Sequence, residues 1–236
     1  MPPVTKQGAP ANRLLAALPK EEYQRLLPEL RPVTLAFGKI LHEPGAIIRH
    51  VYFPNDSIVS LISEVAERST LEVAIVGNEG MTGISVFMGV ARSRTRALVQ
   101  CGGSAMRMKS AYLGRESDRS GALTRLLRRY THSLFTQISQ SAACNRFHKV
   151  DARLARWMLM THDRTGSDEF RLTQEFMSNM LGVRRERVNM AAGDLQREKL
   201  ISYSRGMIKI RDRAGLETVA CECYSIIKEE TDSFLH

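Results

Sequence analysis

Between residues 122 and 165 the chain contains neither glycine nor proline, and this stretch constrains the fold more than any other feature. Glycine and proline are the residues that most often end helices, so long helices are predicted over 121–149 and 150–165. In the first of these, large side chains recur at a spacing near four residues. They are Leu123, Leu127, Tyr130, Leu134 and Ile138. Such a stripe fits either a core helix or a dimer seam, and we favour the dimer, because a long helix between two domains needs a partner.

The chain before this stretch has a different pattern of residue types. From residue 31 to about residue 112, short β-branched runs such as SIVSLIS and LEVAIVG alternate with Gly, Pro, Asn and Asp. Strand-sized runs separated by turn residues predict a barrel or sandwich of β-strands. The fold class is therefore α+β. We expect an N-terminal β domain over 1–120, the long helix over 121–149, and a C-terminal domain over 150–236.

The charge of the chain restricts its partners only loosely. The formal net charge is +9 and the isoelectric point is about 9.7, which favours a polyanionic partner but also fits a basic enzyme. No run of about 18 apolar residues predicts a membrane span, and the N-terminus has no apolar stretch of signal-peptide length. A cytoplasmic protein that does not contact membranes is expected.

Cysteine and histidine spacings predict no metal site. The four cysteines lack CxxC spacing, and Cys221-Glu222-Cys223 is tighter than an ordinary zinc knuckle. The six histidines form no HxH or HExxH pair. We therefore expect reduced thiols, dispersed histidines and no cofactor.

Residues 173–197, TQEFMSNMLGVRRERVNMAAGDLQR, have the layout of a helix-turn-helix. Thr173 is a good N-cap, because its hydroxyl can accept a hydrogen bond from a free backbone N–H of the first turn. The first helix is predicted to end near Met180. Gly182 then suits a tight turn that needs a left-handed residue. A second helix is predicted from Arg184 to about Glu198.

The outer face of that second helix carries the chemistry of base recognition. Arg185, Glu186 and Asn189 are predicted to lie in its first turn and a half, the part that faces base edges in such motifs. Arginine suits guanine, glutamate accepts from cytosine, and asparagine pairs with adenine. Phosphate contacts are assigned to Thr173, Arg184, Arg187 and Arg197. The competing interpretation is a solvated, arginine-rich face on a core helix, and we favour DNA binding because the cap, glycine and inner-face spacing coincide.

The next segment, LISYSRGMIKIRD, predicts a β-hairpin that turns at Ser204-Arg205-Gly206. A hairpin directly after a recognition helix is a wing. Arg205 and Lys209 on it are predicted to contact phosphates.

At this point the chain resembles the Crp/Fnr family of bacterial transcription regulators. LTQEFMSNMLGVRRERV is similar to the family's helix-turn-helix signature, in which an Arg-Glu pair, here Arg185 and Glu186, opens the recognition helix. The resemblance implies an N-terminal β-roll of the cyclic-nucleotide-binding type as a sensor, a dimerisation helix, and a C-terminal winged helix-turn-helix. It implies no enzymatic activity. Its implied partners are double-stranded DNA and a second copy of the chain, with RNA polymerase as a further candidate.

The chain departs from the family's cyclic-AMP binders. Those proteins use a Gly-Glu pair for the ribose and an Arg-Ser pair for the phosphate, whereas here Gly80-Met81 or Gly83-Ile84 and Thr95-Arg96 stand at those places. Cyclic-AMP dependence is therefore not expected. Arg92, Arg94 and Arg96 form a possible effector loop, with a solvated basic loop as the alternative. No cysteine precedes Cys101, which argues against the family's N-terminal iron–sulfur sensor.

Two other functions stand as alternatives. One is a small-molecule sensor module with weak or non-specific DNA binding, against which the base-reading residue types argue. The other is a hydrolase or transferase, for which no Ser/His/Asp or paired-carboxylate constellation stands out. A homodimeric DNA-binding regulator on a near-palindromic operator is the function that the sequence favours.

Overall fold

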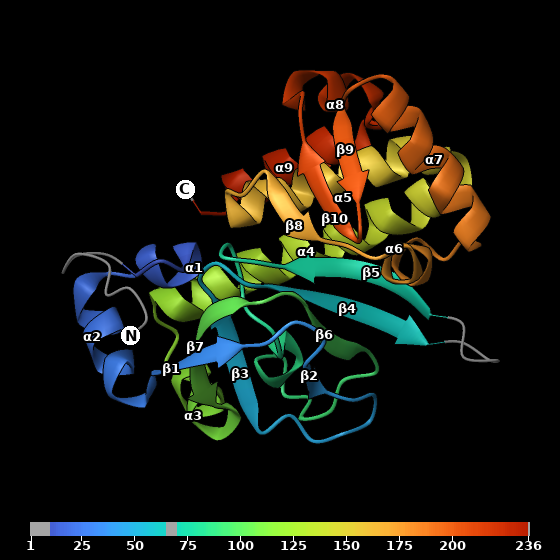
Figure 1. Cartoon of the computed structure of the whole chain (residues 1–236). Helices are drawn as coiled ribbons and strands as arrows, with labels where there is room; N and C mark the ends of the chain where they lie inside the picture. The colour runs from blue at the N-terminus through green and yellow to red at the C-terminus, as the bar shows by residue number, and fades with distance from the viewer. Residues whose placement is uncertain (1–9, 65–69, 236) are drawn as a thin grey trace.

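The chain forms an N-terminal part (residues 10–117) and a C-terminal part (residues 150–235), which one long helix connects (Figure 1). The computed structural model describes residues 10–64 and 70–235. The first nine residues of the predicted β domain, and residues 65–69 and 236, lie outside the described residues. Within the described part, none of the helices combines the length and the apolar character that a bilayer crossing requires.

Two antiparallel sheets make up the centre of the N-terminal part, with strand orders β1-β7-β3 and β2-β6-β4-β5. Their inward side chains, among them Val51, Phe53, Val76 and Val99, share one core, so the sheets pack face to face as the strand-sized runs predict. The strands are β1 (Arg31–Leu35), β2 (Ile40–His42), β3 (His50–Pro54), β4 (Ile58–Glu64), β5 (Thr70–Val76), β6 (Arg96–Cys101) and β7 (Gly103–Lys109).

Short helices close the ends of this core. Asn12 caps the first one, because its side-chain oxygen accepts from the Leu15 N–H while its amide donates to Pro54 and Gly80 carbonyls. The helices are α1 (Arg13–Ala16), α2 (Lys20–Leu26), η1 (Leu27–Glu29), η3 (Ile84–Val86) and α3 (Ser110–Ser117).

The long helix α4 (Ala122–Phe147) runs where the glycine-free and proline-free stretch predicted it. Its first backbone N–H groups, those of Ala122 and Leu123, donate to the carboxylate of Glu22 at 2.8 and 3.0 Å. A carboxylate at the positive end of a helix stabilises it, which compensates for the missing side-chain cap at Gly121.

The apolar stripe of α4 does not form the exposed seam that we predicted. Leu123, Leu127, Tyr130 and Leu134 are buried in the core of their own chain, and only Ile138 of the predicted set is exposed, at 37%. Helix α9 (Cys223–Ser233) lies along α4, and the ring of Phe234 just after it packs 5.8 Å from the Tyr130 ring. The exposed face of α4 instead carries Phe135, at 68%, beside Ile138.

The C-terminal part begins with α5 (Val150–Thr165), which ends at the left-handed Gly166 as the Gly166-Ser167-Asp168 break predicted. Around α5 lie α9, three further helices and a small antiparallel sheet of order β8-β10-β9. These elements are β8 (Glu169–Arg171), α6 (Gln174–Leu181), α7 (Arg185–Arg197), β9 (Ile201–Ser204), β10 (Met207–Ile210) and α8 (Arg213–Val219).

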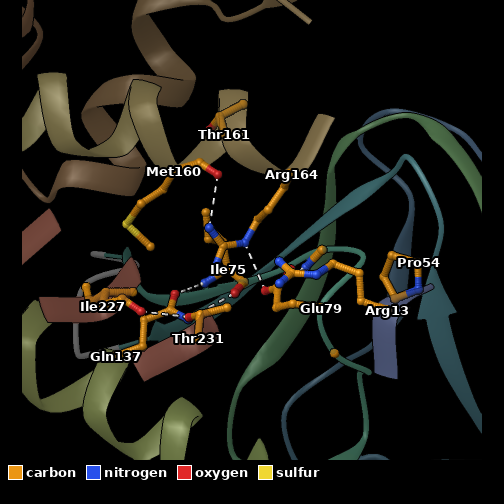
Figure 2. A network of polar contacts seen from close by, with 12 residues as sticks. Arg13, Pro54, Ile75, Glu79, Gln137, Met160, Thr161, Arg164, Ile227 and Thr231 are labelled. Carbon is orange, nitrogen blue, oxygen red and sulfur yellow. Dashed lines mark hydrogen bonds and ion pairs between the residues drawn. The ribbon is translucent and has the colours of Figure 1, made fainter. Parts of the chain in front are cut away.

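Polar contacts join the two parts across the outer face of the larger sheet, where β4 and β5 lie against α5 and α6 (Figure 1). Trp157 donates from its indole nitrogen to Glu72 at 2.8 Å, and Gln100 donates its amide to the Thr161 hydroxyl at 3.2 Å. The connecting helix α4 is attached to the same sheet, because its Gln137 side chain pairs with both backbone groups of Ile75, at 2.7 and 3.2 Å (Figure 2). Buried, directional contacts of this kind fix how the two parts are oriented.

The most buried ion pair of the described residues lies in the same interface. Arg164 reaches from α5 to Glu79 in the loop after β5, at 2.9 Å, and both side chains are almost fully buried (Figure 2). Gly77 makes room for it, because a Cβ there would lie 2.7 Å from the Arg164 side chain. A Cβ on Gly80 would overlap the Tyr130 ring in the same way. The GNEG motif at 77–80 is therefore a packing element between the two parts.

Candidate nucleic-acid interface

The helix-turn-helix has the boundaries that the sequence predicts, within a residue or two. The Thr173 hydroxyl accepts a hydrogen bond from the Phe176 N–H at 3.2 Å, which caps α6 as expected. Helix α6 ends at Gly182, which adopts φ of +61°. Helix α7 then begins at Arg185, with Arg184 at its N-cap position. The left-handed glycine turns the chain between two helices that pack closely.

The inner face of α7 anchors it against α5 and α6. Val188, Ala191, Ala192 and Leu195 are all at most 5% exposed and belong to the core of the C-terminal part. The two alanines allow close approach of the neighbouring helices. Helix α7 is thus packed firmly against its neighbours, so the side chains on its outer face have defined positions.

The outer face presents the three predicted base-reading residues together. Arg185, Glu186 and Asn189 are exposed on the first turn and a half of α7. Arg185 forms an exposed ion pair with Glu175 of α6 at 3.2 Å, so its guanidinium has to exchange this partner to reach a base. Met190 beside them is 62% exposed and can offer a base only apolar contact.

The residues predicted to contact phosphates surround this face. Arg184 and Arg187 are exposed around the start of α7. Arg197, at the other end of the helix, is 78% exposed and pairs with Asp194 at 3.0 Å. Their separation along α7 means that they cannot all approach one phosphate group.

The wing forms as predicted, and it contains a third strand. Residues Arg205 and Gly206 both have positive φ, +50° and +76°, as the tight turn of a two-residue hairpin requires. Strand β8 pairs with β10 on the other side, and the Leu172 N–H donates to the Gly206 carbonyl at 2.7 Å. This bond holds the wing turn next to the start of α6. A shallow depression between them is lined by Thr173–Glu175 and Tyr203–Gly206.

The two wing cations differ in their surroundings. Arg205 is exposed at the turn, beside the depression. Lys209 instead forms an ion pair with Glu169 of β8 at 2.6 Å, and its hydrogen bond lowers the pKa of that carboxyl. A phosphate has to compete with Glu169 for Lys209, but not for Arg205.

The arginines of the predicted effector loop do not converge on one point. Arg92 donates to the Gly45 carbonyl at 2.5 Å, and Arg96 pairs with both Glu43 and Glu64, at 2.7 and 2.6 Å. Arg94 is exposed. The charge of Arg96 is therefore already balanced by two carboxylates.

Neighbouring side chains fill the space at the positions that correspond to the family's ribose-binding pair. Tyr130 fills the space beside Gly80 and donates its hydroxyl to the Met81 carbonyl at 2.9 Å. Gly83 lies against Val51 and Ile48. Met81 itself is fully buried.

One cluster was missed by the sequence analysis. The side chains of Cys144, His148, Cys221 and Cys223 meet at the end of α4. We had expected these residues to be dispersed, because Cys144 and Cys221 are 77 residues apart in the sequence. The signal that was available is a CxxxH spacing on one helix end together with the CxC pair.

Comparisons with known proteins agree with this architecture. Residues 152–219 match the family described as the Crp-like helix-turn-helix domain. A search of curated proteins gave no match.

Solved structures share the fold over about four fifths of the chain. FixK2 from Bradyrhizobium japonicum is 14% identical, with a TM-score of 0.69 over 81% of this chain and 98% of that chain. A CRP-family transcriptional regulator from Thermus thermophilus is 20% identical, with a TM-score of 0.67 over 80% and 96%. The c-di-GMP-responsive regulator CLP from Xanthomonas campestris is 15% identical, with a TM-score of 0.59 over 81% and 99%. The C-terminal part therefore contains a Crp-like helix-turn-helix domain, and the chain shares the fold of these solved structures.

Proposed function

We propose that the protein acts as a homodimer that reads a near-palindromic operator through Arg185, Glu186 and Asn189, without cyclic AMP. The observation that carries this proposal is the exposed cluster of those three side chains on a helix whose opposite face is locked into the core. Two such helices related by a two-fold axis enter successive major grooves about 34 Å apart. The operator then repeats its half-site with that spacing.

The proposed dimer contact is the exposed face of α4. Phe135 and Ile138 lie one helical turn apart on it, and large exposed apolar side chains at this spacing are what a helix–helix seam requires. Of the residues first predicted to form the seam, only Ile138 belongs to this face. The others pack in the chain's own core, and they are Leu123, Leu127, Tyr130 and Leu134. A seam on this long helix holds the two DNA-binding parts at a fixed separation.

Independence from cyclic AMP rests on the packing beside Gly80. A ribose needs open space and a hydrogen-bonding side chain at that place, and the Tyr130 ring and the buried Met81 occupy it instead. The effector-loop arginines offer a phosphate no convergent site, because Arg96 is neutralised and Arg92 is held by a carbonyl.

The experiment is selection of random DNA duplexes by the purified protein without added nucleotide, followed by sequencing. Enrichment of a two-fold-symmetric site supports the proposal, and the same selection with cyclic AMP should give the same site with the same enrichment. Salt-sensitive binding without enrichment contradicts it. That result favours the alternative, a small-molecule sensor with non-specific DNA binding, whose affinity depends on salt but not on sequence.

A further inference from the structure

Four metal-binding side chains converge at the junction between α4 and the C-terminal part. We call them the junction cluster: Cys144, His148, Cys221 and Cys223. Cys144 lies in the last turn of α4 and His148 directly follows that helix. The two other cysteines lie at the start of α9. The cluster therefore joins the end of the long helix to the last helix of the DNA-binding part.

The donor atoms are spaced as one tetrahedral ion requires. All four lie within 4.8 Å of one another, with 3.5 Å between the Cys144 and Cys221 sulfurs and 3.6 Å between the Cys223 sulfur and Nδ1 of His148. Zinc bonds of about 2.3 Å to sulfur and about 2.0 Å to nitrogen place two sulfurs about 3.8 Å apart and a sulfur and a nitrogen about 3.5 Å apart in a regular tetrahedron. The separations of 3.5 and 3.6 Å lie within about 0.3 Å of these edges, and the limit of 4.8 Å on all donor pairs is about 1 Å longer than an edge.

The histidine is oriented as in known zinc sites. Its Nδ1 faces the sulfurs, while its Nε2 lies 3.1 Å from Oε1 of Glu222. Zinc-ligating histidines commonly donate their second ring N–H to a carboxylate, which fixes the tautomer that leaves the first nitrogen free to bind. Glu222 stands between the two cysteines in sequence, so the CEC segment supplies two ligands and the orienting carboxylate.

The surroundings suit a buried anionic site. Cys144 and Cys223 are at most 2% exposed, which protects thiolates bound to an ion. Arg153 and Arg156 are also buried, at 5% and 7%, and both lie in electrostatic range of the Cys144 sulfur. Neither forms an ion pair with a carboxylate among the described residues. Three thiolates, a neutral imidazole and Zn²⁺ carry one net negative charge, which these arginines can balance.

Other chemistry fits the cluster less well. A disulfide holds its two sulfurs about 2.05 Å apart, and it does not account for the third cysteine and the histidine beside them. An iron–sulfur cluster distributes its ligands over several iron atoms, which requires wider spacing than this group shows. Three cysteines and one histidine are a common ligand set of closed, structural zinc sites.

We infer that the junction cluster binds one Zn²⁺ ion per chain in a closed four-coordinate site. The ion fastens the end of α4 to the start of α9. It thereby holds the DNA-binding part at a fixed orientation to the long helix. All four positions of the ion are filled by protein, so its role is structural.

The first test uses the unaltered protein and needs no variant. Protein produced in zinc-supplemented medium and purified under reducing conditions should contain about one zinc per chain, as measured by plasma mass spectrometry. Replacing the zinc with Co²⁺ should give visible d–d bands of tetrahedral cobalt and a near-ultraviolet band from thiolate ligands. Protein with no bound zinc and no such cobalt spectrum overturns the inference.

Variants then locate the ion. His148→Gln and Cys223→Ser should each reduce zinc content severalfold, and Cys101→Ser is the matched control, because Cys101 lies outside the junction cluster and should retain full zinc. Glu222→Gln should weaken zinc affinity about 10- to 100-fold, the usual effect of removing the carboxylate that orients a ligand. Equal zinc contents in His148→Gln, Cys223→Ser and Cys101→Ser mean that the zinc binds elsewhere.

Two further results also decide against the inference. Iron with acid-labile sulfide in the anaerobically purified protein assigns the cluster to iron–sulfur chemistry. A Cys144–Cys221 disulfide found by peptide mass spectrometry, in protein that binds no metal when reduced, assigns it to thiol redox chemistry. Selection of an operator by the protein is a separate measurement, so failure of the zinc site leaves the proposed DNA recognition intact.

Discussion

The Arg164 guanidinium donates from Nε to Oε1 of Glu79 at 2.9 Å, and this buried bond links α5 of the C-terminal part to the loop after β5. Removing one partner of a buried pair leaves the other charge without compensation, which costs about 3–5 kcal/mol. Arg164→Met should therefore lower the free energy of unfolding by about that amount in urea titration. The exposed pair of Lys228 and Asp232 is the control, and Lys228→Met should cost at most about 1 kcal/mol. Similar losses in both variants contradict our view that the Arg164–Glu79 pair holds the interface.

Base reading and phosphate binding are separable by mutation. Arg185→Ala should lose about 1–3 kcal/mol of binding free energy for each half-site of the selected operator and relax the preference at one base pair in each half-site. Arg205→Ala should weaken binding to all duplexes alike and reduce the slope of log K against log salt by about 0.9 for each protomer, or about 1.8 for the dimer. Fluorescence anisotropy on the operator and on a scrambled duplex measures both effects. A uniform loss in both variants contradicts the assignment of Arg185 to bases.

Lys209 should matter less than Arg205, although both are wing cations. Its ammonium group already pairs with Glu169 at 2.6 Å, so contact with a phosphate gains little over the existing ion pair. Lys209→Ala should change affinity for any duplex by less than half the free-energy loss of Arg205→Ala, in the same anisotropy titration. A larger loss for Lys209→Ala shows that the Glu169 pair opens on DNA.

The two faces of α4 should respond differently to substitution. Phe135→Asp places a charge on the exposed face and should convert the dimer to a monomer in sedimentation experiments, with little change in the melting temperature of the fold. Leu127→Ala removes a fully buried side chain and should cost about 2–5 kcal/mol of stability while leaving the dimer intact. The opposite pattern, a dimer lost with Leu127→Ala and kept with Phe135→Asp, places the seam on the face that the sequence first indicated.

Glu72 should make stability fall as pH rises. Burial raises the pKa of this carboxyl from 4.5 to about 7, and the hydrogen bond from Trp157 lowers it only partly. Between these two pH values the unfolded chain has released the proton and the folded chain retains it, so the free energy of unfolding decreases with pH across that window. Glu72→Gln should remove a decrease on the order of 1–3 kcal/mol between pH 4.5 and 8. Urea titrations at both pH values measure it, and identical pH dependence in the variant and the parent contradicts the assignment.

The helix-turn-helix and the wing were predictable because local signals specify them. Thr173 caps its own helix, Gly182 turns the chain at the end of that helix, and Arg205-Gly206 closes a two-residue turn. Each of these signals acts over a short stretch of chain. The exposure of Arg185, Glu186 and Asn189 follows from the helical period once the inner face is known.

The burial of the predicted seam residues and the junction cluster were not predictable in this way. Periodicity identifies the apolar stripe of α4, but it does not identify what covers it. Here the core of the N-terminal sheets covers it together with Phe234, which lies far from the stripe in sequence. Cys144 and Cys221 meet only because α9 returns along α4. The ion pair of Lys209 was not predictable either, because its partner Glu169 lies 40 residues before it in the sequence.

The position of Phe234 has a consequence for synthesis of the protein. Its ring is 2% exposed and belongs to the same core as the N-terminal sheets. A chain that emerges from the ribosome with its N-terminus first cannot complete that core until residue 234 has left the exit tunnel. During translation the N-terminal sheets therefore remain incompletely packed until α9 and Phe234 have left the exit tunnel.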